Sequence, residues 1–392
     1  MIPLRTTDVT DHRGLPRAVE AALDGSAPLA LGFDPGAADR VPEGTAVVIA
    51  TSGSSGVPKR VVLSAAALRA SAEATAARIG AGQWLLALPA GYVAGLQVLV
   101  RSLLAGTRPV ALRGRFAVGS FLDAAAELDR EPALTSLVPA QLATLVEAAD
   151  DARVRDALGR FDAILVGGQA LPPSLRDRAA DLGVRLVRTY GSSETSGGCV
   201  YERTPLDVVR VRAVDGELQI AGPTLAAGYL GDEVQTADRF IWDAGVRWYR
   251  TGDLGEVRDG IVRVVGRVDN VIVSGGVNVS LDRVEAVVRG LAGFGGAVVV
   301  GVDDDRWGES PGVVVPRGEL PGADLPAEAP AGGEHLGALR EAVGTVLGVA
   351  ARPSIVLPVE EVPLLASGKP DRTAIRRILH EAAHGSGPRS GI

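Results

Sequence analysis

Residues 51–60 read TSGSSGVPKR, a run of small residues that ends in a proline and two cations. The run follows residues 46–50, an apolar stretch typical of a buried strand. It precedes Ser64, which can cap a helix that runs to Arg78 and stops at Gly80. We therefore expect a loop that joins a strand to a helix. Glycines and hydroxyls beside free backbone amides, followed by a lysine, would suit phosphate oxygens.

The loop differs from that of the common nucleoside triphosphatases. Their motif, G-x-x-x-x-G-K-[ST], needs a lysine directly after the second glycine, whereas Val57 and Pro58 stand between Gly56 and Lys59 here. No hydroxyl follows the lysine. Taken alone, the stretch is as compatible with a flexible Gly/Ser connection as with a phosphate site.

Length, composition and net charge indicate a globular protein and argue against a nucleic-acid-binding or membrane protein. The chain has 392 residues, of which 46% are hydrophobic, enough for a large core in roughly two or three domains. A net charge of -7 and a pI of about 5.3 argue against nucleic acid as a partner. The single cysteine, Cys199, excludes an internal disulfide, and we expect it to be a packed small residue rather than a nucleophile. With no signal peptide and no long apolar span, we expect a cytoplasmic protein without membrane insertion.

The pattern along the chain predicts three parts. From residue 46 to about 200, short apolar strands alternate with helical stretches, which indicates a layered α/β domain. From residue 211 to 273, short strands and turns predict a β-rich subdomain. After Gly266 we expect a smaller α+β unit with a helix from about Leu281, capped by Ser280. Residues 316–334 are rich in Pro, Gly, Ala and Glu and predict an exposed loop.

Four further stretches have the composition of site loops, with polar or charged side chains beside glycines. They are residues 166–170 (VGGQA), 189–195 (TYGSSET), 249–253 (YRTGD) and 363–369 (PLLASGK). Together with TSGSSGVPK, and in this order, they resemble the motifs of the adenylate-forming superfamily of acyl-CoA synthetases, luciferases and peptide-synthetase adenylation domains. The resemblance extends from about Thr51 to Arg376, and five ordered motifs make it specific.

The resemblance implies the fold and the way in which ATP binds. It implies an α/β adenylate-forming enzyme with a large N-terminal domain, residues 1–267, and a small mobile C-terminal domain, residues 268–392, with a hinge near Asp269. The phosphate loop, which would hold the β and γ phosphates of ATP, is formed by Thr51, Ser52, Gly53, Ser54, Ser55, Gly56 and Lys59.

Further roles follow from the same resemblance. Gly167 and Gly168 would line one face of the adenine and Tyr190 the other. The neighbouring Gln169, Gly191 and Ser192 would also belong to the nucleotide site. Asp253 and Arg267 match the ribose contacts, and Ser193 matches the contact to the α-phosphate. Glu194 matches the Mg²⁺ ligand, a hard oxygen donor. Lys369 matches the catalytic lysine, which would bridge the attacking carboxylate and the phosphate.

The second half-reaction needs a thiol, which coenzyme A would supply. Rotation about Asp269 would withdraw Lys369 and bring another loop to the site. That loop contains Ser274, Gly275 and Gly276, and its paired glycines would let a pantetheine arm pass.

One more segment bears on the carboxylic acid. Residues 88–103 resemble the L-P-x-x-H-[VI]-[SA]-G segment and following helix of the actinobacterial o-succinylbenzoate-CoA ligases of menaquinone biosynthesis. Tyr92 replaces the usual histidine but leaves an aromatic ring, and Gly95 is retained. The resemblance implies that Arg101 would bind the second carboxylate of a dicarboxylic aryl acid. The alternative is an ordinary arginine on a helix surface.

We therefore expect an ATP-dependent ligase that makes o-succinylbenzoyl-CoA from an aryl carboxylic acid, ATP and CoA. The alternatives are another aryl- or acyl-CoA ligase and a stand-alone adenylation enzyme that loads a carrier protein. A non-catalytic nucleotide-binding protein is disfavoured by Glu194, Asp253, Arg267 and Lys369. The sequence leaves a homodimer open.

Overall fold

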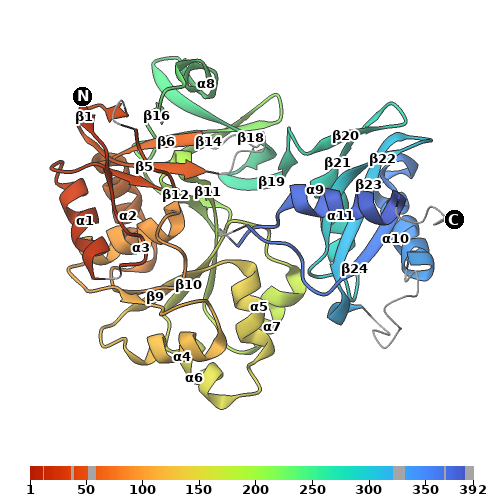
Figure 1. Ribbon diagram of the computed structural model, residues 1–392, viewed down its shortest axis with the longest axis horizontal. Helices are drawn as coiled ribbons and strands as arrows, with labels where there is room; N and C mark the ends of the chain where they lie inside the picture. The colour runs from red at the N-terminus through yellow and green to blue at the C-terminus, as the bar shows by residue number, and fades with distance from the viewer. Residues whose placement is uncertain (12, 37–38, 52–58, 321–331, 366–367, 385–392) are drawn as a thin grey trace, which may run out of the picture. The chain divides into compact units, whose positions relative to one another are not determined.

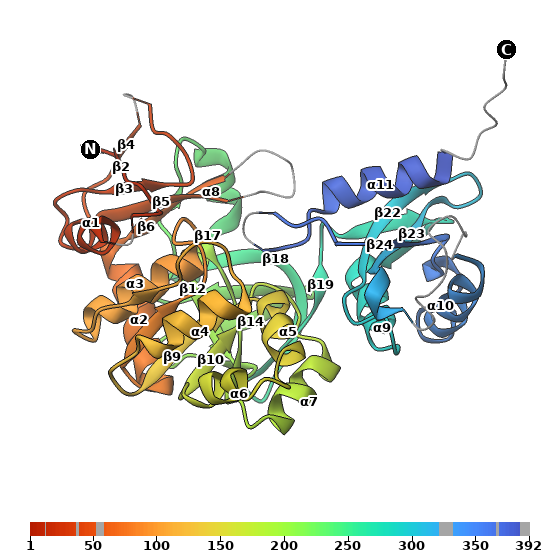
Figure 2. The same cartoon turned by 60° about the horizontal axis from the view of Figure 1, so that its bottom comes forward.

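The structure is a computed structural model that describes the chain except for residues 12, 37–38, 52–58, 321–331, 366–367 and 385–392. It contains two compact units, whose elements are labelled in Figures 1 and 2. The larger unit comprises Met1–Leu171, Leu175–Thr251 and Gly255–Arg263, and the smaller comprises Pro172–Ser174, Gly252–Leu254 and Val264–Ile392. The domain boundary after residue 267 and the hinge at Asp269 remain predictions.

The opening stretch belongs to a five-stranded sheet of the larger unit. Its strand order is β16 (Gly228–Tyr229), β6 (Lys59–Ser64), β5 (Thr45–Thr51), β3 (Leu29–Leu31) and β2 (Arg5–Thr6). A separate two-stranded sheet pairs β1 (Ile2–Pro3) with β4 (Arg40–Val41). Helix α1 (Gly14–Leu23) packs against β3 and β5.

The prediction that residues 51–60 form a loop between a strand and a helix was wrong. β5 and β6 are antiparallel neighbours with Thr51 opposite Lys59, so the segment connects two strands. The reason is the apolar run Val61-Val62-Leu63, which is buried and completes the sheet before the helix begins. The helix itself is as predicted: α2 (Ala65–Ile79) starts behind Ser64, whose hydroxyl accepts a hydrogen bond from Ala67 N at 3.1 Å.

A seven-stranded sheet forms the centre of the larger unit. Its strand order is β13 (Thr204–Pro205), β12 (Gly197–Tyr201), β11 (Leu186–Ser192), β10 (Ala163–Val166), β9 (Ala133–Leu137), β7 (Gln83–Leu86) and β8 (Val110–Ala111). β8, β7, β9, β10 and β11 are parallel, and β12 and β13 are antiparallel additions.

Helices cover both faces of this sheet, which confirms the predicted α/β layering (Figure 2). Trp84 and Leu86 face one core with α2 and α3 (Val93–Leu104), while Leu85 faces the other. The other face packs against α4 (Val118–Ala126), α5 (Pro139–Glu147), α6 (Ala152–Gly159) and α7 (Pro173–Asp181). Alternate residues of one strand thus serve two cores, as a parallel sheet buried on both faces requires.

The predicted β-rich region is also present. Its strands follow the order β14 (Arg210–Val214), β15 (Glu217–Ala221), β18 (Val246–Arg258) and β17 (Phe240–Asp243), with β19 (Ile261–Arg267) beside β18. The short helix α8 (Glu233–Arg239) leads directly into β17.

The smaller unit is an α+β structure, as expected. Its sheet has the order β21 (Val277–Ser280), β20 (Val271–Ser274), β23 (Gly308–Pro316) and β22 (Val298–Asp304), with β24 (Ile355–Val359) beside β23. The helices are α9 (Leu281–Arg289), α10 (Gly332–Leu347) and α11 (Arg372–His384), with short 3-10 turns at Arg317–Glu319 and Val349–Ala351. Ser280 caps α9, as predicted, by accepting a hydrogen bond from Arg283 N at 3.4 Å.

The predicted exposed loop at residues 316–334 was too wide at both ends. Pro316 closes β23, Leu320 is buried after a 3-10 turn, and α10 already begins at Gly332. The prediction rested on the average composition of the segment, and such an average does not show that one apolar residue, Leu320, is buried. Residues 321–331 lie outside the described part of the chain.

No helix among the described residues is both long and apolar enough to cross a lipid bilayer.

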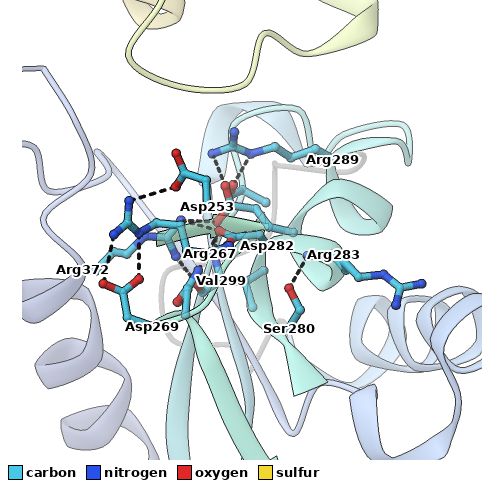
Figure 3. Close-up of polar contacts among 12 residues, drawn as sticks. Asp253, Arg267, Asp269, Ser280, Asp282, Arg283, Arg289, Val299 and Arg372 are labelled. Carbon is cyan, nitrogen blue, oxygen red and sulfur yellow. Dashed lines mark hydrogen bonds and ion pairs between the residues drawn. The ribbon is translucent and has the colours of Figure 1, made fainter. Parts of the chain in front are cut away.

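A buried carboxylate ties three elements of the smaller unit together. Glu285 on α9 is 8% exposed; its Oε2 accepts hydrogen bonds from Arg372 Nη2 at 2.9 Å and Val299 N at 3.1 Å. Its Oε1 lies 3.0 Å from Arg289 Nη2. Figure 3 shows Arg289, Val299 and Arg372 in this network. Glu285 therefore joins α9 to β22 and α11.

We expect Glu285→Ala to lower the free energy of unfolding of the smaller unit by about 3 kcal/mol, because two arginines lose their shared counter-charge. Hydrogen exchange of α9 and α11 in the full chain would measure the loss. Glu341→Ala, which truncates an exposed glutamate on α10, is the matched control. Equal exchange in the two variants would contradict this account.

Candidate active site

The ends of two parallel strands bring two predicted site loops together. β10 and β11 are adjacent and in register, with Val166 opposite Arg188. Gly167, Gly168 and Gln169 follow β10, and the segment from Tyr190 to Ser192 ends β11. The carboxyl edge of a parallel sheet is where α/β folds place their ligands.

Close packing explains two of the glycines. A Cβ at Gly167 would lie 2.4 Å from Thr189 Oγ1, and one at Gly191 would lie 2.2 Å from Gly197 O. The pairing of β11 with β12 shifts register between Tyr190 and Gly191, so the chain bends where the site loop starts. Tyr190 is half-buried against the main core.

A buried turn follows, and it carries Ser193 and Glu194. Ser193–Thr195 is one 3-10 turn, and Ser196 has a left-handed φ of 55°. The Ser196 carbonyl accepts hydrogen bonds from Gln97 Nε2 at 2.8 Å and Ser71 Oγ at 3.0 Å. Side chains of α2 and α3 thus fix the position of the turn through hydrogen bonds to the Ser196 carbonyl. Sequence analysis missed Gln97 and Ser71, since nothing in their local pattern indicates a long-range partner.

Glu194 has a partner that the sequence analysis also missed. Its side chain is 8% exposed, and the Tyr229 hydroxyl donates a hydrogen bond to Oε1 at 3.0 Å. Lys59 Nζ lies 5.6 Å from the centroid of the same ring. Burial, and then the charge of Glu194, raise the pKa of Tyr229 above its ordinary value, so the hydroxyl keeps its proton. The aromatic residue in the glycine-containing stretch 226–231 (AAGYLG) was the available signal.

Only the two ends of the predicted phosphate loop are described. The Thr51 hydroxyl donates to Lys59 O at 3.4 Å across the strand pair. Ser52, Gly53, Ser54, Ser55 and Gly56 lie outside the described residues, and their predicted roles remain predictions.

Glu194 fits the expected Mg²⁺ site. Mg²⁺ retains several waters and binds proteins through one or two carboxylates together with substrate phosphates. In the parts of the chain that are described, no group of three or more His, Cys, Asp or Glu side chains could hold a metal on its own. A single oriented carboxylate beside a lysine therefore suits a metal that arrives with a nucleotide.

In the smaller unit, one guanidinium joins three predicted site residues (Figure 3). Arg267 Nη1 donates to Asp253 Oδ1 at 3.0 Å, which brings the two predicted ribose contacts together. Its Nε and Nη2 donate to both oxygens of Asp269, at 2.7 and 3.0 Å. The predicted hinge residue is therefore fixed to the predicted ribose site through Arg267.

The predicted CoA loop is the turn between β20 and β21. Gly275 and Gly276 have φ angles of 57° and 80°, and Ser274 is buried beside them. A Cβ at Gly275 would lie 2.4 Å from the Trp307 ring. Glycine is therefore required at this position both by the positive φ and by the close contact.

Lys369 lies in an exposed turn of the smaller unit. Its carbonyl accepts a hydrogen bond from Leu365 N at 2.8 Å, and Gly368 N donates to Leu365 O at 2.8 Å. Ala366 and Ser367 lie outside the described residues.

The residues predicted for the acid lie on and before α3. Tyr92 is half-buried at the start of the helix, and Gly95 is buried where a Cβ would lie 2.3 Å from Pro89 O. Arg101 is only 7% exposed. The alternative of an ordinary surface arginine was therefore wrong.

Arg101 is a buried cation that forms no ion pair with any residue that the structure describes. Its Cζ lies 5.0 Å from the Trp84 ring centroid, and its Nη2 donates to the Tyr201 hydroxyl at 3.3 Å. Within the described residues it has no ion pair, and its Nε has no hydrogen-bond partner. Burial lowers the pKa of Arg101 from its ordinary value. The side chain lines a cavity of about 110 Å³, together with Trp84, the exposed Glu73 and small residues of α2.

Cys199 is the packed residue that the sequence predicts. It is completely buried, and burial raises the pKa of its thiol to about 12. A thiolate is thus unavailable near neutral pH.

Comparison with protein families finds two matches along the chain. Residues 4–230 match the family described as AMP-binding enzyme. Residues 283–369 match the AMP-binding enzyme C-terminal domain.

Relatives and solved structures agree with these matches. A probable 2-succinylbenzoate–CoA ligase of Mycobacterium tuberculosis is 40% identical over 352 residues, which cover 88% of this chain and 87% of the relative. The 2-succinylbenzoate–CoA ligase of Salmonella typhimurium is 32% identical over 68% of this chain and 56% of its own length.

Among solved structures, o-succinylbenzoate CoA synthetase from Bacillus subtilis in complex with the acyl-adenylate intermediate OSB-AMP has a TM-score of 0.69. It is 24% identical, and the match covers 99% of this chain and 84% of that one. The amide bond synthetase McbA from Marinactinospora thermotolerans has a TM-score of 0.71 at 25% identity, covering 93% and 78%. The predicted adenylate-forming fold is confirmed.

Tyr229→Phe should separate the two contacts of this ring. It removes the hydrogen bond to Glu194 but keeps the ring beside Lys59, so we expect ATP binding in the presence of Mg²⁺ to weaken about fivefold. ATP binding in EDTA should hardly change. Calorimetric titration under both conditions measures the difference, and equal weakening in both would contradict a role for Tyr229 in orienting Glu194.

Proposed function

Because the chain belongs to the AMP-binding enzyme family, we propose that this acyl-CoA ligase converts o-succinylbenzoate, ATP and CoA into o-succinylbenzoyl-CoA, AMP and pyrophosphate. The product would serve menaquinone biosynthesis. The observation that carries the choice of acid is the buried charge of Arg101, which has no ion pair in the described part of the chain.

The reaction has two steps. In the first, a carboxylate oxygen of the acid attacks the α-phosphorus of ATP, and the bond to pyrophosphate breaks. In the second, the sulfur of CoA attacks the acyl carbon, AMP leaves with the bonding electrons, and the thiol proton passes to solvent. Each step exchanges one leaving group, so no oxidant or reductant is needed.

The residues of the larger unit support the first step. Lys59 supplies positive charge to the phosphates, and Ser193 lies next to the carboxylate of Glu194 on the same turn. Glu194 would hold Mg²⁺, which when bound would neutralise phosphate charge. Tyr229 orients Glu194, and Gln97 fixes the turn that carries it.

The distribution of lysine supports the same assignment. Of the 40 Lys and Arg residues, only two are lysine, namely Lys59 and Lys369. Both occupy positions that the family motif gives to phosphate chemistry. A compact ammonium can lie between oxygens of two groups, whereas the planar guanidinium of arginine binds in a fixed fork. A chain that uses arginine everywhere else has kept lysine at these two positions.

The choice of acid rests on Arg101. An unpaired buried charge is costly, and a ligand carboxylate would restore its balance. Arg101 lies nine residues beyond Tyr92, roughly 13 Å along α3. Gln97, one turn earlier, reaches the carbonyl of Ser196 beside the Glu194 turn. Helix α3 thus carries both a residue that fixes the Glu194 turn and the arginine that we assign to the second carboxylate.

Two other functions remain to be tested against this one. A different aryl- or acyl-CoA ligase would use the same machinery with another acid. A stand-alone adenylation enzyme would load a carrier protein, and thioester formation with free CoA alone distinguishes it from the proposed ligase.

Lys369→Ala should lower the rate of adenylation by about 10²- to 10³-fold, because the charge that develops as pyrophosphate leaves loses its partner. Thioester formation from supplied o-succinylbenzoyl-adenylate and CoA should be nearly unchanged. Single-turnover measurement of each half-reaction tests this. Lys369→Arg, which keeps the charge, is the control and should retain part of the adenylation rate. Equal loss of both half-reactions would rule out the assigned role.

Arg101→Met keeps a long side chain but removes the charge. We expect it to raise KM for o-succinylbenzoate about 30-fold or more, as expected for loss of a charge-assisted contact. KM for 2-butyrylbenzoate, in which a methyl replaces the distal carboxylate, should hardly change. Steady-state AMP release with both acids measures the ratio. If KM rises alike for both acids, Arg101 does not bind the second carboxylate.

A further inference from the structure

Two buried hydroxyl groups stand behind Arg101 and have no role in the reaction described above. Tyr201 on β12 is 1% exposed, and Thr75 on α2 is completely buried. Helices α2 and α3 both pack against β12, so three elements bring the two hydroxyls and Arg101 together (Figure 1). Buried hydroxyls need hydrogen-bond partners, and those of Tyr201 and Thr75 belong to one continuous series of hydrogen bonds that includes Arg101.

Each hydroxyl has one proton to donate, and this determines which residue is the donor in each of these hydrogen bonds. The Thr75 hydroxyl donates its one proton to Ser71 O at 2.8 Å. Thr75 and Tyr201 are 2.9 Å apart, so the proton between them must come from Tyr201. The phenol oxygen is left with its lone pairs, and it accepts from Arg101 Nη2 at 3.3 Å. The order is therefore Arg101 to Tyr201 to Thr75 to the backbone of α2.

Because its proton is donated to Thr75, the Tyr201 oxygen has a defined role toward Arg101. It can only accept from the guanidinium, which Trp84 also stacks against at 5.0 Å. Both neighbours position the guanidinium without neutralising it, because neither carries a negative charge. Its Nε is buried and has no hydrogen-bond partner among the described residues, so these contacts leave the charge of the guanidinium unbalanced. A carboxylate is the group that such a planar, charged donor binds best.

We propose that Tyr201, supported by Thr75, is a positioning residue that sets the specificity of the enzyme for dicarboxylic aryl acids. It holds Arg101 in the orientation that receives the distal carboxylate and has no part in the chemistry at the first carboxylate. This inference rests on the proposed function, since it concerns the same acid site. Glu73, the exposed carboxylate that lines the cavity, opposes binding of an anion and limits its affinity.

The test compares two acids in variants that lose a hydroxyl only. Tyr201→Phe should raise KM for o-succinylbenzoate about fivefold with kcat nearly unchanged, because one hydrogen bond to a charged group is lost. KM for 2-butyrylbenzoate should not change. Thr75→Val should act in the same direction and more weakly. The double variant should be no worse than Tyr201→Phe alone, because both residues act through one chain of hydrogen bonds.

A structural role alone would give another result. Thr135→Val is the matched control: Thr135 is buried in β9 of the same unit and donates to Leu85 O at 2.9 Å, without contact to Arg101. It should lower thermal stability and leave the ratio of the two KM values unchanged. Glu73→Gln should lower KM for o-succinylbenzoate alone.

The outcomes separate the inference from the proposed function. If Tyr201→Phe raises KM equally for both acids, or not at all, while the wild-type enzyme uses o-succinylbenzoate, only the inference about Tyr201 is overturned. If the wild-type enzyme releases AMP with other aryl acids but not with o-succinylbenzoate, the proposed function fails and this inference fails with it.

Discussion

The carbonyl of Ser196 is the point on which the larger unit's site depends. It ends a buried turn in a left-handed conformation and accepts hydrogen bonds from α2, through Ser71, and from α3, through Gln97. The turn carries Ser193 and Glu194, and β12 leaves it towards Tyr201. One backbone oxygen therefore couples the position of the Glu194 carboxylate to α2 and α3, the helices beside the proposed acid site.

A second constraint is the cost of burying charge. Glu194 and Arg101 are both nearly inaccessible, and neither has an ion pair among the described residues. Each is held by a tyrosine hydroxyl, which donates to Glu194 and accepts from Arg101. A neutral hydroxyl satisfies one hydrogen bond of the charged side chain but does not balance its charge, which a ligand of opposite charge can do. This arrangement supports the proposal that Glu194 binds a cation and Arg101 a carboxylate of the substrate.

The sequence predicts local features well and long-range partners poorly. Ser64 and Ser280 cap their helices as expected, since capping depends on a few neighbouring residues. The strand β6 was missed because its apolar run, Val61-Val62-Leu63, is short and directly precedes the helix cap at Ser64. The resemblance led to Glu194, Asp253 and Arg267, but Tyr229, Gln97 and Tyr201 became visible only when distant elements were brought together. Arg101 could be identified from its motif, yet its burial could not.

The central claim is that one chain joins o-succinylbenzoate to CoA through an acyl-adenylate. The most direct measurement is AMP and pyrophosphate release by the purified wild-type protein over a panel of aryl acids, each with and without CoA. We expect o-succinylbenzoate to give the highest kcat/KM, its adenylate to accumulate without CoA, and sustained AMP release to require CoA. Preference for a monocarboxylic aryl acid, or no AMP release with any acid, would contradict it.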